Sequence, residues 1–317
     1  MAKNKVKTPK QRGASFWKRF FRDGVLRAAF YFLLATLSFV FLYPFIKMIT
    51  QSLMTDDDLI NITVKWLPSE LTWSNYNVAF KKLQFGTYVW NSVKVAAVAT
   101  LGHVFSCAMT GYAFARYHFR FKGVLFGFVI LSMIVPVQTI IIPSYMQYSN
   151  WGWINSEYYL PLLVPTFFGF GLSGGFFIFL FRQFFLGLPY EMEEAARVDG
   201  CGPIRTYLRI MLPMSQSSLL VCSVLSLVWH WNDYFEPGVY ITDVWLKMLP
   251  NRLPSLYAEL NKEQHTMIQV NDIEGLMFNE AMLMAATFLC IVPILIMYLV
   301  LQRRFMEGVE RSGLTGM

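Results

Sequence analysis

Ionisable side chains gather in residues 189–213, a polar segment that lies between two long apolar stretches. They are Glu191, Glu193, Glu194, Arg197, Asp199, Arg205 and Arg209. Between Glu194 and Arg197 lies the pair Ala195-Ala196, whose short side chains leave a flat surface that another protein can approach closely. A carboxylate beside such a surface suits docking into a partner's cleft. The alternative is a solvated loop whose charges only set membrane topology.

The same segment carries the signals of a helix, a turn and a second helix. Pro189 suits a first helical turn, and the glutamates after it lie where the helix dipole favours negative charge. Gly200 and Gly202 permit the turn, and Pro203 can open the second helix. This punctuation fixes the angle between the first helix and the apolar stretch that begins near Pro213. The segment can therefore transmit a push from a soluble partner.

The whole chain has the composition of a membrane protein. Of its 317 residues, 55% are hydrophobic and 15% are charged, whereas a soluble domain has roughly a quarter charged residues. The net charge of +7 does not indicate nucleic acid, because Lys and Arg in a membrane chain set its orientation. The four cysteines have neither disulfide-framework nor zinc-site spacing, so we expect no bound metal.

Six apolar stretches predict an all-α integral membrane protein with six transmembrane helices. They cover residues 28–46, 95–115, 123–146, 158–181, 210–232 and 281–302. Each has about the 20 residues that a helix needs to cross the hydrocarbon layer, whereas the strands of a barrel are about half as long. Pro136 and Pro143 predict a kink in the third stretch.

The distribution of Lys and Arg orients these spans. With the N-terminus in the cytoplasm, nineteen of the 27 basic residues lie on cytoplasmic segments and seven on outer ones. Both termini and the polar segment are then cytoplasmic. The predicted parts are a tail of residues 1–27 with a short interfacial helix, a transmembrane domain of residues 28–302 and a tail of residues 303–317. Outer loops 47–88 and 237–280 are expected to carry short helices, and residues 182–213 form the cytoplasmic loop.

The polar segment resembles the EAA motif of importer-type ABC transporter permeases. Glu194-Ala195-Ala196 is followed after three residues by Gly200, and after nine more by Ile210-x-Leu212-Pro213. Asp199 before Gly200 and the preceding Leu188-Pro189 resemble the carbohydrate-uptake branch, specifically the maltose-type second permease subunit. The family resemblance extends to Asn91-Ser92, Pro136-x-Gln138, Ile142-Pro143, Trp231-Asn232-Asp233 and Gln302-Arg303-Arg304-Phe305. The resemblance covers nearly the whole chain. It implies the type I ABC importer permease fold, in the bacterial cytoplasmic membrane.

The resemblance further implies a non-catalytic subunit that works by alternating access, while a partner ATPase uses ATP and Mg. No Walker A pattern occurs in the sequence, so we expect no cofactor in this chain. The implied partners are a homologous second permease subunit, two ATP-binding subunits, an extracytoplasmic solute-binding protein and membrane lipid. The residues implied to couple to the ATPase are Glu193, Glu194, Ala195, Ala196, Arg197, Asp199 and Gly200.

Polar and aromatic side chains in or beside the spans are candidates for the substrate path. They are Gln138, Trp229, Asn232 and Asp233. Tryptophan at a span end is more often an interface anchor, which is the favoured interpretation of Trp229 and Trp231, and a lone histidine such as His230 more often packs helices. The loop of residues 237–280 is expected to reach the binding protein. The predicted function is a permease for sugar import, with an oligosaccharide as the expected substrate and glycerol-phosphate uptake as the alternative.

Two other classes explain the sequence less well. A secondary transporter without an ATPase has charged or broken-helix sites at the midplane and often inverted repeats, whereas the spans here are uncharged and show no repeat. A membrane-embedded enzyme would need a catalytic cluster, but the four histidines are scattered and no His-Glu-x-x-His occurs. Both classes leave the polar segment without a role.

Overall fold

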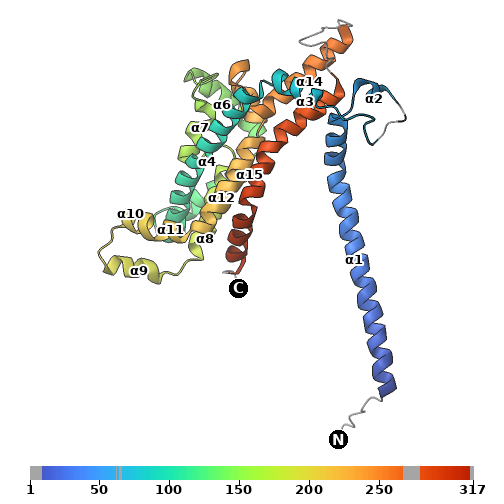
Figure 1. Ribbon diagram of the computed structural model, residues 1–317. Helices are drawn as coiled ribbons and strands as arrows, with labels where there is room; N and C mark the ends of the chain where they lie inside the picture. The colour runs from blue at the N-terminus through green and yellow to red at the C-terminus, as the bar shows by residue number, and fades with distance from the viewer. Residues whose placement is uncertain (1–8, 62, 64–65, 267–278, 315–317) are drawn as a thin grey trace.

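The computed structural model describes residues 9–61, 63, 66–266 and 279–314, and this described part is all-helical (Figure 1). The longer helices are α1 (Pro9–Ser52), α3 (Ser74–Lys82), α4 (Phe85–Arg116), α5 (Lys122–Ile134), α6 (Val137–Asn150), α8 (Gly174–Leu186), α9 (Glu191–Val198), α12 (Gln216–Asn232), α14 (Leu249–Thr266) and α15 (Glu280–Leu314). The short elements are α2 (Asp56–Ile60), α7 (Leu160–Leu163), η1 (Val164–Phe168), α10 (Pro203–Thr206), η2 (Tyr207–Met211), α11 (Leu212–Met214), α13 (Phe235–Tyr240) and η3 (Val244–Leu246).

α4 is the central helix of the bundle and packs against both α8 and α12 (Figure 1). Small side chains make this close packing possible, because lipid supplies no hydrophobic force between helices and contact depends on how near the backbones come. Ala99, Gly102, Ala108 and Gly111 are all buried along α4. α4 therefore lies at the centre of the bundle, with α8 and α12 packed against it.

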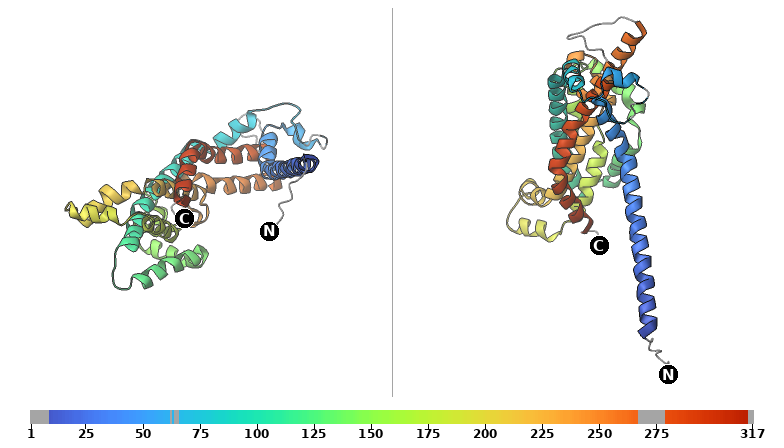
Figure 2. Two further views of the ribbon diagram at one scale, coloured as in Figure 1. Left: turned by 90° about the horizontal axis from the view of Figure 1, so that it is seen from below. Right: turned by 45° about the vertical axis from the view of Figure 1, so that its right-hand side comes forward.

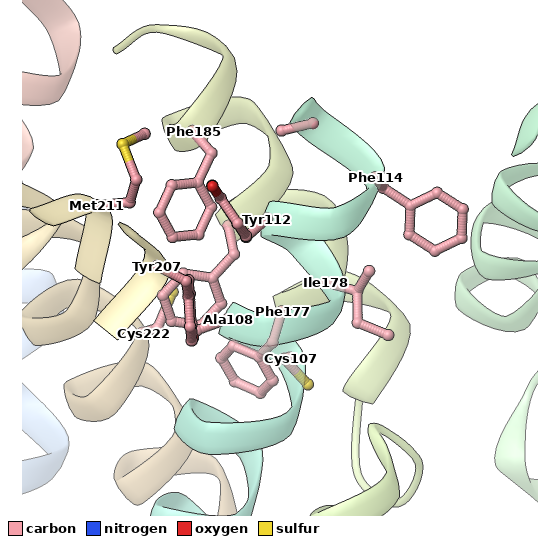
Figure 3. Packing of buried hydrophobic residues seen from close by; sticks show 12 residues of the cluster. Cys107, Ala108, Tyr112, Phe114, Phe177, Ile178, Phe185, Tyr207, Met211 and Cys222 are labelled. Atoms are coloured by element: carbon pink, nitrogen blue, oxygen red, sulfur yellow. The ribbon is translucent and has the colours of Figure 1, made fainter. Parts of the chain in front are cut away.

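An aromatic cluster fills the lower half of the bundle, between α4, α8, η2 and α12 (Figure 3). Phe177, Phe181 and Phe185 of α8 are fully buried in it. Tyr112 of α4 lies against Phe185, with ring centroids 5.3 Å apart, and Met211 closes the cluster from η2. η2, which follows the turn after α9, is thus packed into the same core as the central helix.

α1 stands apart from the bundle over most of its length (Figures 1 and 2). All its side chains from Gly24 to Lys47 are exposed, and the helix contacts α15, where Gln51 Nε2 donates a hydrogen bond to Glu280 Oε2 over 2.9 Å. The sequence predicts a separate short helix within residues 1–27. The structure instead has residues 9–52 as one continuous helix, and residues 1–8 lie outside the described part.

The number of unbroken spans differs from the predicted six. In the described residues, three helices are long and apolar enough to cross a membrane: Gly24–Ser52, Phe85–Arg116 and Glu280–Arg303. The predicted third span is two helices that meet at 102°, and the predicted fifth is a pair that meets at 78°. The length and composition of the described helices therefore allow three to five spans.

Local backbone chemistry explains these breaks. α5 ends at Ile134, and Val135 is extended, because a residue before proline is disfavoured in the helical region; the kink predicted at Pro136 is confirmed. The predicted fourth span, residues 158–181, is interrupted by positive φ angles at Gly169, Gly171 and Ser173. Its longest helix, α8, begins only at Gly174 and runs to Leu186.

The two segments predicted as outer loops contain helices, as expected from the sequence. Within residues 47–88, α2 begins with a capping box in which Thr55 and Asp58 each bond the other's backbone N–H. Buried Asn75 of α3 donates hydrogen bonds to the carbonyls of Ser52 and Met54. Within residues 237–280 lie η3 and α14, together with most of α13, and residues 267–278 lie outside the described part.

Candidate functional site

The predicted helix, turn and second helix are present in residues 189–213. α9 begins two residues after Pro189, and Gly200 makes the turn with φ +78°. Gly202 is extended and Pro203 is the first residue of α10. α9 and α10 project sideways from the lower end of the bundle, on the side away from α1 (Figures 1 and 2). Residues 189–213 therefore form a protrusion from the bundle (Figure 1).

α9 has an inner and an outer face. Glu193 and Ala196, three residues apart, are buried with 3% and 2% of their surface exposed. The other predicted coupling residues are exposed: Glu194, Ala195, Arg197, Asp199 and Gly200. Of the two alanines expected to pack against a partner, Ala195 is exposed, whereas Ala196 packs within this chain. Sequence spacing alone does not show which alanine faces inward.

Arg116, the last residue of α4, holds the inner face of α9. Its Nε lies 3.1 Å from Glu193 Oε1, and both side chains are almost fully buried. Its Nη2 donates a 2.6 Å hydrogen bond to the carbonyl of Leu188, and its guanidinium lies 4.3 Å from the Tyr190 ring centroid. The sequence analysis counts Arg116 only among the basic residues that indicate topology. The signal that could have identified its role is a basic residue at the end of a predicted helix together with a glutamate-rich loop.

The second arm of the turn is also fixed to α4. η2 is a π-helical segment, a wider turn than the α-helix and frequent at functional sites. Its Tyr207 ring lies 5.0 Å from that of Tyr112, one helical turn before Arg116. One face of α4 thus contacts both α9 and η2, on either side of the turn.

The four predicted substrate-path residues have four different surroundings. Gln138 is exposed in the first turn of α6, and Asn232 is exposed at the end of α12. Trp229 is half-buried and packs on Phe176 and Phe177 at the edge of the aromatic cluster, with both centroid distances 5.2 Å, rather than standing free as an interface anchor. Trp231 is buried. Asp233 Oδ1 accepts hydrogen bonds from the backbone N–H groups of Phe235 and Glu236.

Asp233 also lines a small cavity at the end of α12, together with His230 and Glu236. Burial raises the pKa of Asp233 to about 6. Burial, and the charge of Asp233, raise the pKa of Glu236 to about 7. Glu236 was not among the residues predicted from the sequence. Within the described residues, no cluster of His, Cys, Asp or Glu has the arrangement of a metal site.

His230 packs between helices, as was favoured from the sequence. Its ring lies 5.0 Å from that of His103 on α4, and Ser226 Oγ lies 3.3 Å from the Nδ1 atom of each histidine. Nε2 of His103 is 3.0 Å from the carbonyl of Phe170. This polar chain joins α4, α12 and the broken segment before α8.

Comparison with known proteins gives relatives that align over most of the chain. The arabinooligosaccharides transport system permease protein AraQ of Halalkalibacterium halodurans is 27% identical, with 89% of this chain and 94% of the relative covered. The probable starch degradation products transport system permease protein AmyC of Thermoanaerobacterium thermosulfurigenes is 26% identical, covering 88% and 93%. The sn-glycerol-3-phosphate transport system permease protein UgpE of Yersinia enterocolitica is 26% identical, covering 86% and 91%.

A solved structure has the same fold. It is a bacterial ABC transporter involved in the import of the acidic polysaccharide alginate, and one of its chains superposes with a TM-score of 0.74 at 21% identity. The match covers 95% of this chain and 99% of the other. A family model, described as the binding-protein-dependent transport system inner membrane component, matches residues 107–311. Because that match spans more than half of the sequence, the chain belongs to the family of binding-protein-dependent transport system inner membrane components.

Proposed function

We propose that this chain is the permease subunit of an ATP-driven, binding-protein-dependent sugar importer, and that the outer face of α9 docks into an ATPase subunit. The observation that carries the proposal is the two-faced character of α9. Its inner face is anchored by Arg116, while Glu194, Ala195 and Arg197 remain exposed. A protruding helix that is held so firmly on one side is built to receive force on the other.

The chain works in an assembly with a second permease subunit, two ATP-binding subunits and an extracytoplasmic binding protein. ATP and Mg belong to the ATP-binding subunits, and this chain contributes half of the translocation path. ATP binding closes the ATPase pair, moves α9 and opens the path outward. Alternating access of this kind needs stiff elements that connect the docking helix to the outer loops, and α4 has the required length and position.

The six-span topology with both termini in the cytoplasm is part of this proposal. The Lys and Arg distribution supports the orientation. In this topology α5 with α6, η1 with α8, and α10–α12 form three crossings that are bent or broken. Irregular backbone at membrane depth is tolerated where it is buried in protein or lines a water-filled path, which suits a translocation subunit in the bacterial cytoplasmic membrane.

Sugar is the favoured substrate class. Relatives named for arabinooligosaccharides and for starch degradation products support it, while a relative named for sn-glycerol-3-phosphate supports the alternative. Gln138, Trp229 and Asn232 offer amide groups and a ring, which suit hydroxyls and sugar faces. The carboxyl of Asp233, which has a pKa of about 6 and is therefore mostly ionised at neutral pH, lines the small cavity and would disfavour a phosphate there. The loop of residues 237–280 is assigned to contact with the binding protein.

Co-purification of the ATPase from membranes, through an affinity tag on this chain, tests the docking role. Glu194→Lys reverses a charge on the exposed face, and Gly200→Pro prevents the φ of +78° that the turn requires. Both variants should lose the ATPase and ATP-dependent sugar uptake. Glu157→Lys makes the same charge change at an exposed site in the predicted outer loop between the third and fourth spans and should retain both. Retention of the ATPase and of uptake by the α9 variants would refute the docking role.

A further inference from the structure

We infer that Arg116 is a positioning residue through which α9 moves α4, and that α4 carries this movement as a rod to the outer segment around residues 245–249. The inference rests on the proposed function, because it assumes that α9 receives the ATPase. It adds a role for four residues outside the docking motif: Asn91, Ser92, Tyr112 and Arg116.

The lower end of the rod is a buried ion pair. Neither Arg116 nor Glu193 can leave its partner without leaving a charge in a water-poor site, which is strongly unfavourable. The other groups at the pair are the Leu188 carbonyl, the Tyr190 ring and Arg197, whose Nη2 lies 3.9 Å from Glu193 Oε2. Arg197 is mostly exposed, so it cannot replace Arg116. A displacement of α9 must therefore displace the end of α4.

The second arm of the docking element reinforces this attachment. Tyr112 lies four residues before Arg116, and side chains with this spacing share one face of a helix. Its ring contacts Tyr207 of η2. α9 and η2 are consequently held by adjacent positions on one face of α4. The turn between them then moves with α4 as a unit.

The upper end of α4 is bonded to the outer segment by side chains that are themselves buried. Asn91 Nδ2 donates hydrogen bonds of 3.0 Å and 3.1 Å to the carbonyls of Trp245 and Lys247. Ser92 Oγ accepts a 2.8 Å hydrogen bond from the N–H of Leu249. Asn91 and Ser92 are 5% and 2% exposed. Movement of α4 therefore changes the position of backbone that the proposed function assigns to the outer face.

Between these ends α4 is one uninterrupted helix of 32 residues. At a rise of 1.5 Å per residue, Asn91 and Arg116 lie about 37 Å apart along the axis. Several neighbouring crossings bend or break, but α4 does not. A continuous helix with polar bonds at both ends can transmit a displacement without absorbing it in a hinge.

Cysteine labelling of the outer segment in the full complex tests this transmission. Val244, which is 51% exposed, becomes the reporter as Val244→Cys in a chain whose native cysteines are replaced. The labelling rate is measured in nanodiscs without nucleotide and with MgATP plus vanadate. We expect the rate to depend on nucleotide in the parent, to lose that dependence in Arg116→Gln, and to regain it in Arg116→Glu combined with Glu193→Arg. Asn91→Ala should lose the dependence from the opposite end.

Two results distinguish the inference from the proposed function. If the parent complex lacks the ATPase, the proposed function fails. If the parent responds to nucleotide and Arg116→Gln or Asn91→Ala responds equally, the proposed function stands and the rod is refuted. A charge-swapped chain that assembles with the ATPase but stays unresponsive also overturns the role of the pair. If Arg116→Gln does not fold, Asn91→Ala provides the test, because it leaves no unpaired buried charge. Loss of the nucleotide dependence in Asn91→Ala supports transmission through α4, and an unchanged dependence refutes it.

Discussion

Gly111 of α4 lies against Phe181 of α8 so closely that a Cβ atom at Gly111 would be 2.7 Å from the Phe181 Cβ. The same Cβ would lie 2.9 Å from the backbone nitrogen of Arg182. The Phe181 Cβ atom and the Arg182 backbone nitrogen cannot be moved aside by a side-chain rotation. An added Cβ atom at position 111 would therefore push the two helices apart. α4 and α8 form one packed unit, and the segment that contains α9 follows directly after α8.

Gly111→Ala should therefore destabilise the protein by about 1–3 kcal/mol, the usual cost of overpacking a tight contact. Gly127→Ala, on α5, provides the matched control, because a Cβ there meets nothing within 4 Å. Thermal unfolding of the purified chain in detergent measures both variants. Equal melting temperatures for Gly111→Ala and Gly127→Ala would show that the α4–α8 contact is looser than described.

Asn75 of α3 holds the C-terminal end of α1 through two hydrogen bonds, which it donates to the carbonyls of Ser52 and Met54. Asn75→Ala removes both and leaves the buried carbonyls of Ser52 and Met54 without this donor, at a cost of about 1–3 kcal/mol. Asn77→Ala, on the same helix but exposed, should change stability by less than about 0.5 kcal/mol. Denaturation of the two variants side by side is the measurement. A smaller effect at position 75 than at 77 would contradict the assigned bonds.

The carboxyl of Glu236 makes stability depend on pH. Burial raises its pKa to about 7, above the ordinary value, so the folded state favours the neutral acid. This contribution is fully present below the unfolded pKa of about 4.5 and is lost as pH rises through about 7. The melting temperature in nanodiscs should thus fall between pH 5 and pH 8. Glu236→Gln should flatten this dependence; an unchanged slope in the variant would assign the titration to another group.

Ser226 connects His103 and His230 through its hydroxyl. Ser226→Ala removes this connection and should cost about 1–3 kcal/mol, because Nδ1 of His103 then loses this partner in a buried site, while His230 Nδ1 keeps its 2.8 Å contact with the Ser226 carbonyl. Ser223→Ala, on the same helix, removes a hydroxyl that bonds only the carbonyl four residues before it among the described contacts and should cost less. Thermal unfolding compares the two variants. An equal loss of stability in both would show that the hydroxyl of Ser226 does not stabilise the two histidines.

Hydropathy was sufficient to predict spans that are straight helices. The stretches 28–46, 95–115 and 281–302 lie within α1, α4 and α15. It could not predict the break before α8, because an average over apolar residues does not register the backbone conformation of Gly169 or Ser173. Pro136 was the exception, since its covalent ring makes a break visible in the sequence.

The segment of residues 189–213 was located from its motif, and the match over residues 107–311 confirms the family of the chain. Its internal anchoring could not be predicted. Glu193 and Arg116 are far apart in the sequence, so no local spacing links them, and Glu193 resembles its exposed neighbour Glu194 in type. Similarly, Trp229 is of the residue type expected for an interface anchor. Only the structure shows that it packs against the rings of Phe176 and Phe177 in the aromatic cluster.

Site-directed cross-linking at the two alanines of α9 tests most directly whether this helix docks through its outer face. In a chain that lacks the native cysteines, Ala195→Cys places a thiol on the exposed face and Ala196→Cys places one on the buried face, 2% exposed. The thiol is labelled with a short maleimide reagent that carries a photoactivatable diazirine, and membranes that contain the whole complex are then irradiated, so that the partner needs no thiol of its own. We expect a covalent product with the ATP-binding subunit from position 195 and none from position 196. No product from position 195, or equal products from both, would contradict the docking of α9 through its outer face.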